Sequence, residues 1–280
     1  AGFRTTTLPS GEAVPVLGLG TWHIAEDPSK RDVELASLRL GLDLGLRLID
    51  TAEMYADGGA EEMVGEAIAG RRDSVFLVSK VLPHHATRHG TVAACEASLR
   101  RLGTDRLDMY LLHWRGSIPL DQTLAGFVEL QKAGRIRHWG VSNFAVADME
   151  ELLDQDGGDQ VETDQVFYNL THRGIEYDLL PWCRRKLGLP VMAYSPIEQG
   201  RLLPKPEVRR IAARHGASPA QIALAWVLRH DGVIAIPKAS TPDHVREDRT
   251  ALDVRLTRED LAELDRAFPP PTHAVPLDIL

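Results

Sequence analysis

Four residues with complementary acid–base chemistry lie in one stretch of the sequence: Asp50 and Tyr55 in LIDTAEMY, Lys80 at the end of VFLVSK, and His113 at the end of LDMYLLH. A carboxylate, a phenol, an ammonium and an imidazole suit a proton-transfer reaction. The ordinary pKa of a phenol is about 10, and we expect the ammonium of Lys80 to lower the pKa of Tyr55 by favouring its phenolate. A buried lysine needs a carboxylate partner to stay charged, and Asp50 is the candidate.

Each of these residues lies at or just after the C-terminal end of a short apolar segment. Eight such segments are expected to form strands, at 16–20, 46–50, 75–80, 107–113, 136–142, 161–166, 190–195 and 233–237. Helical patterns lie between them, for example at 31–45, 91–103, 120–134 and 219–230. Continuous apolar strands that alternate with helices predict a parallel sheet buried on both faces. We therefore predict an α/β fold, a (β/α)8 TIM barrel, whose strand ends converge on one mouth.

The two ends of the chain lie outside this alternation. The segment 4–18 alternates around Pro9, Ser10 and Gly11, which predicts an N-terminal β-hairpin that plugs the bottom of the barrel. Two extra helical segments, 241–252 and 257–268, follow the last strand, and the tail 272–280 is expected to lie over the mouth. We expect residues 1–280 to form a single domain, because α/β barrels reach this size as one unit.

Composition limits the partners of the protein. A formal charge of −8 without a long run of Lys or Arg argues against nucleic acid. No apolar stretch approaches the roughly 20 residues of a membrane span, and AGFRTTTLPSGEAVP has no signal-peptide core. Cys95 and Cys183 form no ligand-spaced pair, so we expect reduced thiols and no metal site. We expect a cytoplasmic monomer that binds neither nucleic acid nor membrane.

The segments GLGTW, LIDTAEMY, GEAI, VSK, LLHW, WGVSN, AYSP and IPKA occur in this order and cover nearly the whole chain. Their order and barrel-compatible spacing resemble the aldo-keto reductases. The stretches LIDTAEMYADGGAEEMVGEA, ASLRRLGTDRLDMYLLHW and GIEYDLLPWC are similar to small bacterial members that reduce methylglyoxal and related aldehydes. The resemblance implies an NADPH-dependent oxidoreductase that converts small aldehydes and ketones to alcohols.

On matching positions, the resemblance implies that Tyr55 is the general acid that protonates the carbonyl oxygen while a hydride reaches the carbonyl carbon. Asp50 and Lys80 would tune this acid, and His113 would orient the carbonyl. The substrate would contact Trp22, Tyr55, His113 and Trp114, in an open pocket with aromatic walls. His84 and His85 in the loop after the third strand are expected beside this pocket.

The resemblance also implies where the cofactor binds. Ser142, Asn143 and Gln165 would hold the nicotinamide carboxamide, Tyr194 would stack on the ring, and Lys238 would lie near the 2′-phosphate. The full set of expected contacts is Gly20, Thr21, Trp22, Asp50, Ser142, Asn143, Gln165, Tyr194, Ser195, Ile197, Lys238, Ser240, His244, Glu247 and Asp248. No GxGxxG follows a strand, so a Rossmann site is not expected. The loops 113–122 and 197–208 are short, and we expect neither to close over the cofactor.

The chain departs from the better-known family pattern at the adenosine end. Many members carry an arginine six residues after the lysine, where this chain has His244, and an asparagine where it has Asp248. A neutral imidazole stacks on adenine but lacks permanent charge. We therefore expect NADPH as the cofactor with weaker discrimination against NADH. Arg246 and Arg249 are candidates for the missing charge.

Two other classes of function fit parts of this pattern. The family includes barrel subunits that bind NADPH and dock on ion channels, and act as sensors with little turnover. Steady turnover would separate that alternative from a reductase. A metal- or carboxylate-dependent barrel hydrolase would share the fold alone. The sequence has no HxH pair at a strand end and no clear acid pair near the mouth, and both argue against it.

Overall fold

Eight parallel strands form the central sheet of the computed structural model, which describes residues 3–280. They are β3 (Leu19–Gly20), β4 (Leu48–Asp50), β5 (Phe76–Val81), β6 (Leu107–Leu112), β7 (Ile136–Ser142), β8 (Asp164–Phe167), β9 (Val191–Tyr194) and β10 (Val233–Ala235), paired in chain order. The sheet closes because the amide of Gly18 donates to the carbonyl of Ala235 (2.9 Å), and the amide of Ala235 donates to that of Val16 (2.8 Å). The predicted (β/α)8 barrel is confirmed.

The regular strands are shorter than most of the predicted ranges. The segment 46–50 becomes a strand only at Leu48, and the segment 161–166 only at Asp164. The last strand ends at Ala235, two residues before Pro237, which has no amide hydrogen for a strand ladder. Apolar runs extend beyond the hydrogen-bonded ladder because the turns that enter a barrel are themselves buried.

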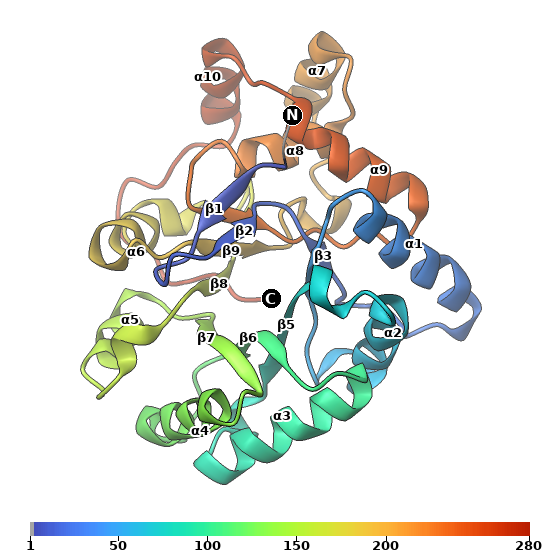
Figure 1. Ribbon diagram of the computed structural model, residues 1–280. Helices are drawn as coiled ribbons and strands as arrows, with labels where there is room; N and C mark the ends of the chain where they lie inside the picture. The colour runs from blue at the N-terminus through green and yellow to red at the C-terminus, as the bar shows by residue number, and fades with distance from the viewer. Residues whose placement is uncertain (1–2) are drawn as a thin grey trace.

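A ring of helices surrounds the barrel (Figure 1). It consists of α1 (Arg31–Asp43), α2 (Gly59–Ile68), α3 (Arg88–Leu102), α4 (Leu120–Lys132), α5 (Val146–Leu153), α6 (Leu179–Leu187), α8 (Pro219–Val227) and α9 (Pro242–Thr250), with α7 (Pro206–His215) and α10 (Arg258–Ala267) added. Helix α7 was not among the predicted helices, although Pro206 at its first turn and Gly216 at its left-handed C-terminal end mark it. Among residues 3–280, no helix is both long and apolar enough to span a membrane.

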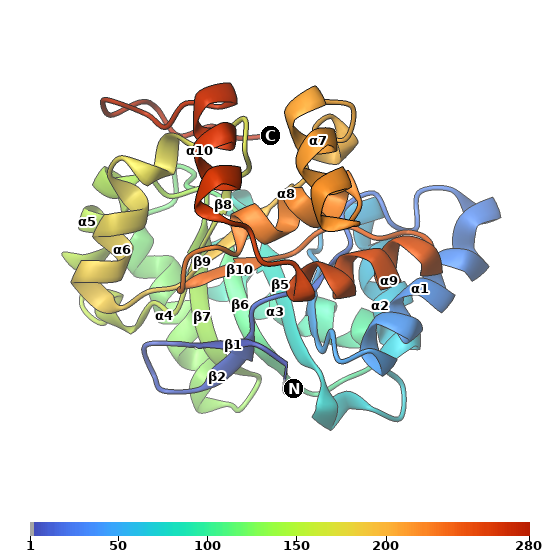
Figure 2. The same cartoon turned by 90° about the horizontal axis from the view of Figure 1, so that it is seen from above.

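The bottom of the barrel is closed by the predicted hairpin of β1 (Thr5–Thr7) and β2 (Ala13–Pro15), which pair antiparallel. Leu8 and Val14 pack into the barrel interior, whose buried side chains are Leu48, Phe76, Val78, Met109, Leu111, Met192, Ile234 and Ile236. The barrel is therefore a packed core, and any ligand must enter from the opposite end. Figure 2 shows the hairpin at one end of the barrel and the C-terminal tail at the other.

The tail crosses the mouth as expected. After α10 the chain passes α6 and ends over the centre of the barrel (Figure 1). Ile279 and Leu280 line the cavity at the mouth, and the amide of Leu280 donates to the hydroxyl of Tyr194 at 3.3 Å. The C-terminal ends of the strands and the tail thus enclose a common space.

Candidate active site

A cavity of about 660 Å³ opens at the C-terminal ends of the strands. Its volume lies within the range of small-molecule and cofactor pockets. Every residue expected to contact cofactor or substrate lines this cavity. Of the four residues expected to be catalytic, Lys80 alone is not among the described residues that line it, because this lysine is fully buried behind Asp50 and Tyr55. The roles assigned to these residues stay predictions.

Strand register places Lys80 beside Asp50. In the β4–β5 pair, Asp50 lies opposite Val78, so Lys80, two residues further along β5, points to the same face of the sheet. Its Nζ donates to Asp50 Oδ2 (2.8 Å), to the carbonyl of Thr51 (2.9 Å) and to the hydroxyl of Tyr55 (3.0 Å). Burial favours the neutral amine, but the charge of Asp50 and the hydrogen bonds to Asp50 and Tyr55 outweigh it and raise the pKa of Lys80. The lysine is therefore held as an ammonium.

The pKa of Tyr55 differs from the one predicted from the sequence. Burial raises the pKa of Tyr55 above its ordinary value, and the ammonium of Lys80 offsets only part of that rise. The expected lowering of this pKa was wrong because it counted the neighbouring charge and not the hydration that the phenol loses when it is buried. A raised pKa keeps the phenol protonated. Since Lys80 donates to the phenol oxygen, the hydroxyl hydrogen of Tyr55 is free to point into the cavity.

His113 follows β6 and is 7% exposed. Its ring lies edge-to-face with Tyr55 (5.8 Å between centroids) and with Trp114 (5.0 Å). Burial, with a further contribution from the charge of Lys80, lowers the pKa of His113 to about 2. Its Nδ1 has no hydrogen-bond partner among residues 3–280. His113 is therefore a neutral imidazole at neutral pH, with one N–H to donate.

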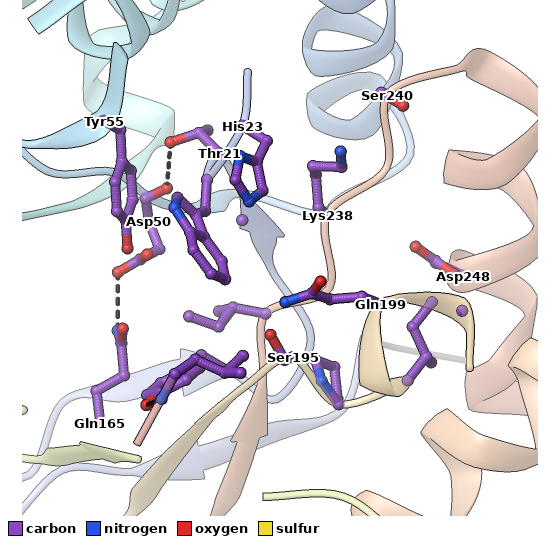
Figure 3. Close-up of a pocket in the computed structure, with 18 of the residues that line it drawn as sticks. Thr21, His23, Asp50, Tyr55, Gln165, Ser195, Gln199, Lys238, Ser240 and Asp248 are labelled. Atoms are coloured by element: carbon purple, nitrogen blue, oxygen red, sulfur yellow. Dashed lines mark hydrogen bonds between the residues drawn. The ribbon is translucent and has the colours of Figure 1, made fainter. Parts of the chain in front are cut away.

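The residues expected at the nicotinamide form a network that reaches the catalytic group. Ser142 and Gln165 lie opposite each other in the β7–β8 register, and Ser142 Oγ donates to the carbonyl of Gln165 (2.9 Å). The amide of Gln165 donates to Asp50 Oδ1 (2.8 Å), as Figure 3 shows. Asn143 donates to the carbonyl of His113 (3.2 Å) and accepts from Tyr194 (2.8 Å). This side of the cavity and the Asp50–Lys80 pair are thus positioned by one set of bonds.

The aromatic walls come from neighbouring strand ends. Tyr194 lies opposite Phe167 in the β8–β9 register, and their rings stack at 5.5 Å with an interplanar angle of 13°. Trp22 stacks on His23 at 4.2 Å. The backbones of His23 (φ 68°), Asn143 (φ 59°) and Ser195 (φ 48°), all at the cavity, are left-handed. Such non-glycine conformations are costly and cluster at functional sites.

Several cavity residues were missed by the sequence analysis, and two expected residues lie elsewhere. His23, Met54, Gln199, Gly200 and Leu203 also line the cavity, and three of these come from the loop 197–208, of which only Ile197 was expected to contact the cofactor. In the sequence, the turn in this loop is marked by Gly200, which follows the polar residues Glu198 and Gln199. In contrast, the described lining of the cavity contains neither His84 nor His85, whose Nδ1 lies 2.8 Å from Glu53 Oε1.

The opposite end of the cavity is formed by the segment after β10 and by α9. Figure 3 shows Lys238, Ser240 and Asp248 at this end and Asp50, Tyr55 and Gln165 at the other. Asp248 is buried. Its burial raises its pKa well above the ordinary value, and the negative charge of Glu247 raises this pKa further. Asp248 Oδ2 has no hydrogen-bond partner in the described part of the chain.

Two arginines of α9 do not supply the charge that His244 lacks. Arg246 pairs with Asp243 (2.9 Å), and Arg249 donates to the carbonyl of Leu44 (3.2 Å). Neither is among the described residues that line the cavity. The suggested compensation was therefore wrong, because these side chains lie on other faces of the helix.

Comparison with known proteins agrees with this geometry. The model of the aldo/keto reductase family matches residues 16–268. The chain is 54% identical over 273 residues to the methylglyoxal reductase YeaE of Escherichia coli, with 96% of each chain covered. It is 35% identical to the glyoxal reductase of Bacillus subtilis, covering 93% of this chain and 91% of the relative. An aldo/keto reductase from Klebsiella pneumoniae, crystallised with NADP and acetate, superposes with a TM-score of 0.97 at 52% identity over the full length of both chains. The chain belongs to the aldo/keto reductase family.

Proposed function

We propose that this protein is an NADPH-dependent oxidoreductase that reduces small aldehydes and ketones, such as methylglyoxal, to alcohols. The observation that carries this proposal is the contact of Lys80 with both Asp50 and Tyr55 at the wall of the cavity. The similarity to a methylglyoxal reductase and to a glyoxal reductase supports the substrate class. The similarity to a reductase crystallised with NADP supports the cofactor.

The residues of the cavity fit an elongated dinucleotide. The ring of Tyr194 offers a stacking surface at one end, beside the polar groups of Ser142, Asn143 and Gln165. At the other end, the cation of Lys238 suits a phosphate, and the unpaired carboxyl of Asp248 suits an amino group of a base. Ser240, His244 and Glu247 complete this end, and Gly20, Thr21, Trp22, Ser195 and Ile197 line the space between. When bound, NADPH would supply the hydride.

The catalytic group of the protein would supply the proton. Tyr55 donates its hydroxyl proton to the carbonyl oxygen of the substrate, and its raised pKa keeps that proton in place until the reaction. The phenolate that remains is stabilised by the ammonium of Lys80, which Asp50 holds. His113, as a neutral donor, orients the carbonyl oxygen toward Tyr55. Trp22 and Trp114 bound the space on the substrate side.

A steady-state assay tests this function. Purified protein is given NADPH or NADH with a panel of small aldehydes and ketones that includes methylglyoxal. We expect continuous turnover with NADPH and somewhat slower turnover with NADH, because His244 lacks the permanent charge of an arginine and discriminates weakly. Tight binding of NADPH without turnover on any carbonyl would support a nicotinamide-binding sensor, and absence of NADPH binding would refute both functions.

The oligomeric state, the cellular compartment and the domain organisation are also proposed. We propose that the protein is a monomer. Light scattering after gel filtration measures this. The buried free thiols of Cys95 and Cys183 agree with a reducing cytoplasm. We also propose that residues 1–280 fold as one domain, which a single cooperative unfolding transition would support.

A further inference from the structure

The C-terminal tail is held against the mouth of the cavity along its length. Val275 packs on Gly174, at which an added Cβ would lie 2.7 Å from Val275 Cγ2. Leu277 packs against the hydrophobic core. Ile279 and Leu280 then line the cavity, although these side chains are 59% and 48% exposed. The apolar end of the tail is therefore positioned by the bond from the amide of Leu280 to Tyr194 (3.3 Å) and by contacts made by the residues before it.

One imidazole links the tail to the barrel. Nδ1 of His172, in the loop after β8, lies 2.9 Å from Asp278 Oδ2, next to the cavity-lining residues of the tail. Nε2 of His172 lies 2.9 Å from Glu198 Oε2, in the loop after β9. Carboxylate oxygens only accept hydrogen bonds, so each of these contacts requires the ring nitrogen of His172 to be the donor. The ring of His172 also packs on Phe167, with 4.3 Å between centroids.

Glu198 is the fixed side of this link. Its side chain is 5% exposed and accepts hydrogen bonds from Asn169 (2.9 Å), Thr171 (3.1 Å) and Arg201 (3.1 Å) in addition to its contact with His172. Its backbone is left-handed (φ 53°). Asp278 is 52% exposed, and the structure gives its side chain one bond, to His172. Loss of His172 would thus leave Glu198 in place and remove the one side-chain hydrogen bond of Asp278.

We propose that His172 is a positioning residue that pins the tail over the mouth through Asp278, and that the pinned tail sets the preference for small substrates. The inference rests on the proposed reductase function. With the tail in place, Ile279 and Leu280 narrow the mouth and contact the substrate. Without the pin, a small aldehyde loses these contacts, whereas a bulkier ketone gains room. The bond network of Asp50, Tyr55 and Lys80 contains no residue of the link, so the chemical step is unaffected.

Hydrogen–deuterium exchange of the protein without substrate tests the position of the tail directly. In His172→Ala and in Asp278→Ala, a peptide covering 275–280 is expected to exchange on the order of tenfold faster than in the wild type. Asp278→Asn keeps an oxygen acceptor for His172, and its exchange is expected to lie between those of wild type and Asp278→Ala. The matched control is His273→Ala, because His273 lies on the same tail and the hydrogen bond of its ring in the described structure is with Thr272 of its own segment. Its exchange is expected to equal that of the wild type.

Kinetics of the same variants test the consequence. KM for methylglyoxal is expected to rise roughly threefold to tenfold in His172→Ala and Asp278→Ala, because each variant loses a partly exposed ion pair and the contacts that this pair orders. kcat and the NADPH dissociation constant are expected to stay within about twofold, and KM for a bulky aromatic ketone is expected to stay equal or fall. Asp278→Ala, on an exposed tail, remains informative if His172→Ala does not fold.

Unchanged exchange of the tail in both alanine variants would overturn the proposal, as would the same increase in His273→Ala. A fall in kcat with unchanged KM would also contradict it, since that pattern would place His172 in the chemical step. A wild-type protein without carbonyl turnover would refute the proposed reductase function instead, and the exchange experiment would still decide whether His172 holds the tail.

Discussion

The two ends of the cavity differ in how their polar groups are satisfied. At the catalytic end, Lys80 is fully buried and makes three hydrogen bonds, and Asp50 accepts from both Lys80 and Gln165. At the adenosine end, Asp248 is buried with an unpaired oxygen, and His244 is exposed. At the catalytic end, the protein itself therefore supplies the hydrogen-bond partners of the buried charged groups. At the adenosine end, the partners of Asp248 and His244 must come from the cofactor, so these two residues influence which cofactor is bound.

Removing a charged residue from the catalytic end of the cavity has the largest expected effect on activity and stability. Lys80→Met should lower kcat by roughly 10²–10⁴-fold, because the phenolate of Tyr55 loses its ammonium. It should also cost about 3–5 kcal/mol of unfolding free energy, because Asp50 becomes an unpaired buried charge. Without Lys80 the pKa of Tyr55 rises further, so any loss of rate at high pH moves to still higher pH.

Rate–pH profiles and urea unfolding measure these effects. The matched control is the double variant Asp50→Asn, Lys80→Met, which removes both charges and should recover much of the stability without recovering activity. A Lys80→Met protein with wild-type kcat and the same pH profile would contradict the role of the pair. The pKa of His113, near 2, predicts that no step near neutral pH arises from this residue.

Adding charge at the open end should change cofactor preference without changing the chemistry. In His244→Arg, a guanidinium gains a charge-assisted bond to the 2′-phosphate of NADPH, a group that NADH lacks. The ratio of the two dissociation constants should rise roughly tenfold or more, which corresponds to about 1.5–3 kcal/mol. Fluorescence titration with both cofactors measures this ratio. Equal changes in both dissociation constants would show that position 244 does not face the 2′-phosphate.

A substitution on the substrate side of the cavity, Trp114→Ala, has an expected effect of intermediate size. Trp114→Ala should raise KM for small aldehydes severalfold and admit bulkier ketones, while NADPH affinity stays nearly constant, because Trp114 lines the cavity beside His113. A core tryptophan would behave differently, and its loss would cost roughly 3–5 kcal/mol of stability. A substrate panel measured beside thermal unfolding separates the two roles. Large destabilisation with an unchanged substrate preference would leave only a packing role.

The smallest effect is expected at Asp248. In the unfolded chain this carboxyl has a pKa of about 3.9, whereas burial raises it well above that value in the folded protein. The stability that the protonated carboxyl of Asp248 contributes is fully present below its pKa in the unfolded chain. This stability is lost as the pH rises through its pKa in the folded protein. Asp248→Asn should therefore melt roughly 2–4 °C higher than the wild type near neutral pH, a difference that vanishes at acid pH.

Melting curves of the protein without cofactor across this pH range check the effect. Asp243→Asn on the same helix is the control, because Asp243 is exposed and pairs with Arg246. A pH-independent gain in Asp248→Asn would mean that the carboxyl of Asp248 does not titrate as proposed.

The sequence predicted the barrel and the residues at its mouth because both depend on local patterns. Apolar runs ending in Asp50, Lys80 and His113 are enough to place these residues at adjacent strand ends. The pKa of Tyr55 was predicted with the wrong sign, since the loss of hydration depends on packing from the whole fold. The faces of Arg246 and Arg249 likewise depend on the rotation of α9 about its axis, which its sequence does not determine.

The remaining misses lie in loops. His23 and Gln199 reach the cavity through left-handed backbone conformations that no residue pattern required, since neither is glycine. His85, expected beside the substrate, bonds to Glu53 instead. Loop geometry is determined by such long-range contacts, so residue type alone could not place these side chains.

The most direct test of the account compares turnover and cofactor binding in Tyr55→Phe. The substitution removes only the hydroxyl that accepts from Lys80 and faces the cavity, and keeps the ring. We predict that kcat for methylglyoxal falls roughly 10²–10⁴-fold while the NADPH dissociation constant changes less than about twofold. Turnover comparable to that of the wild type, with NADPH still bound, would show that Tyr55 is not the proton donor.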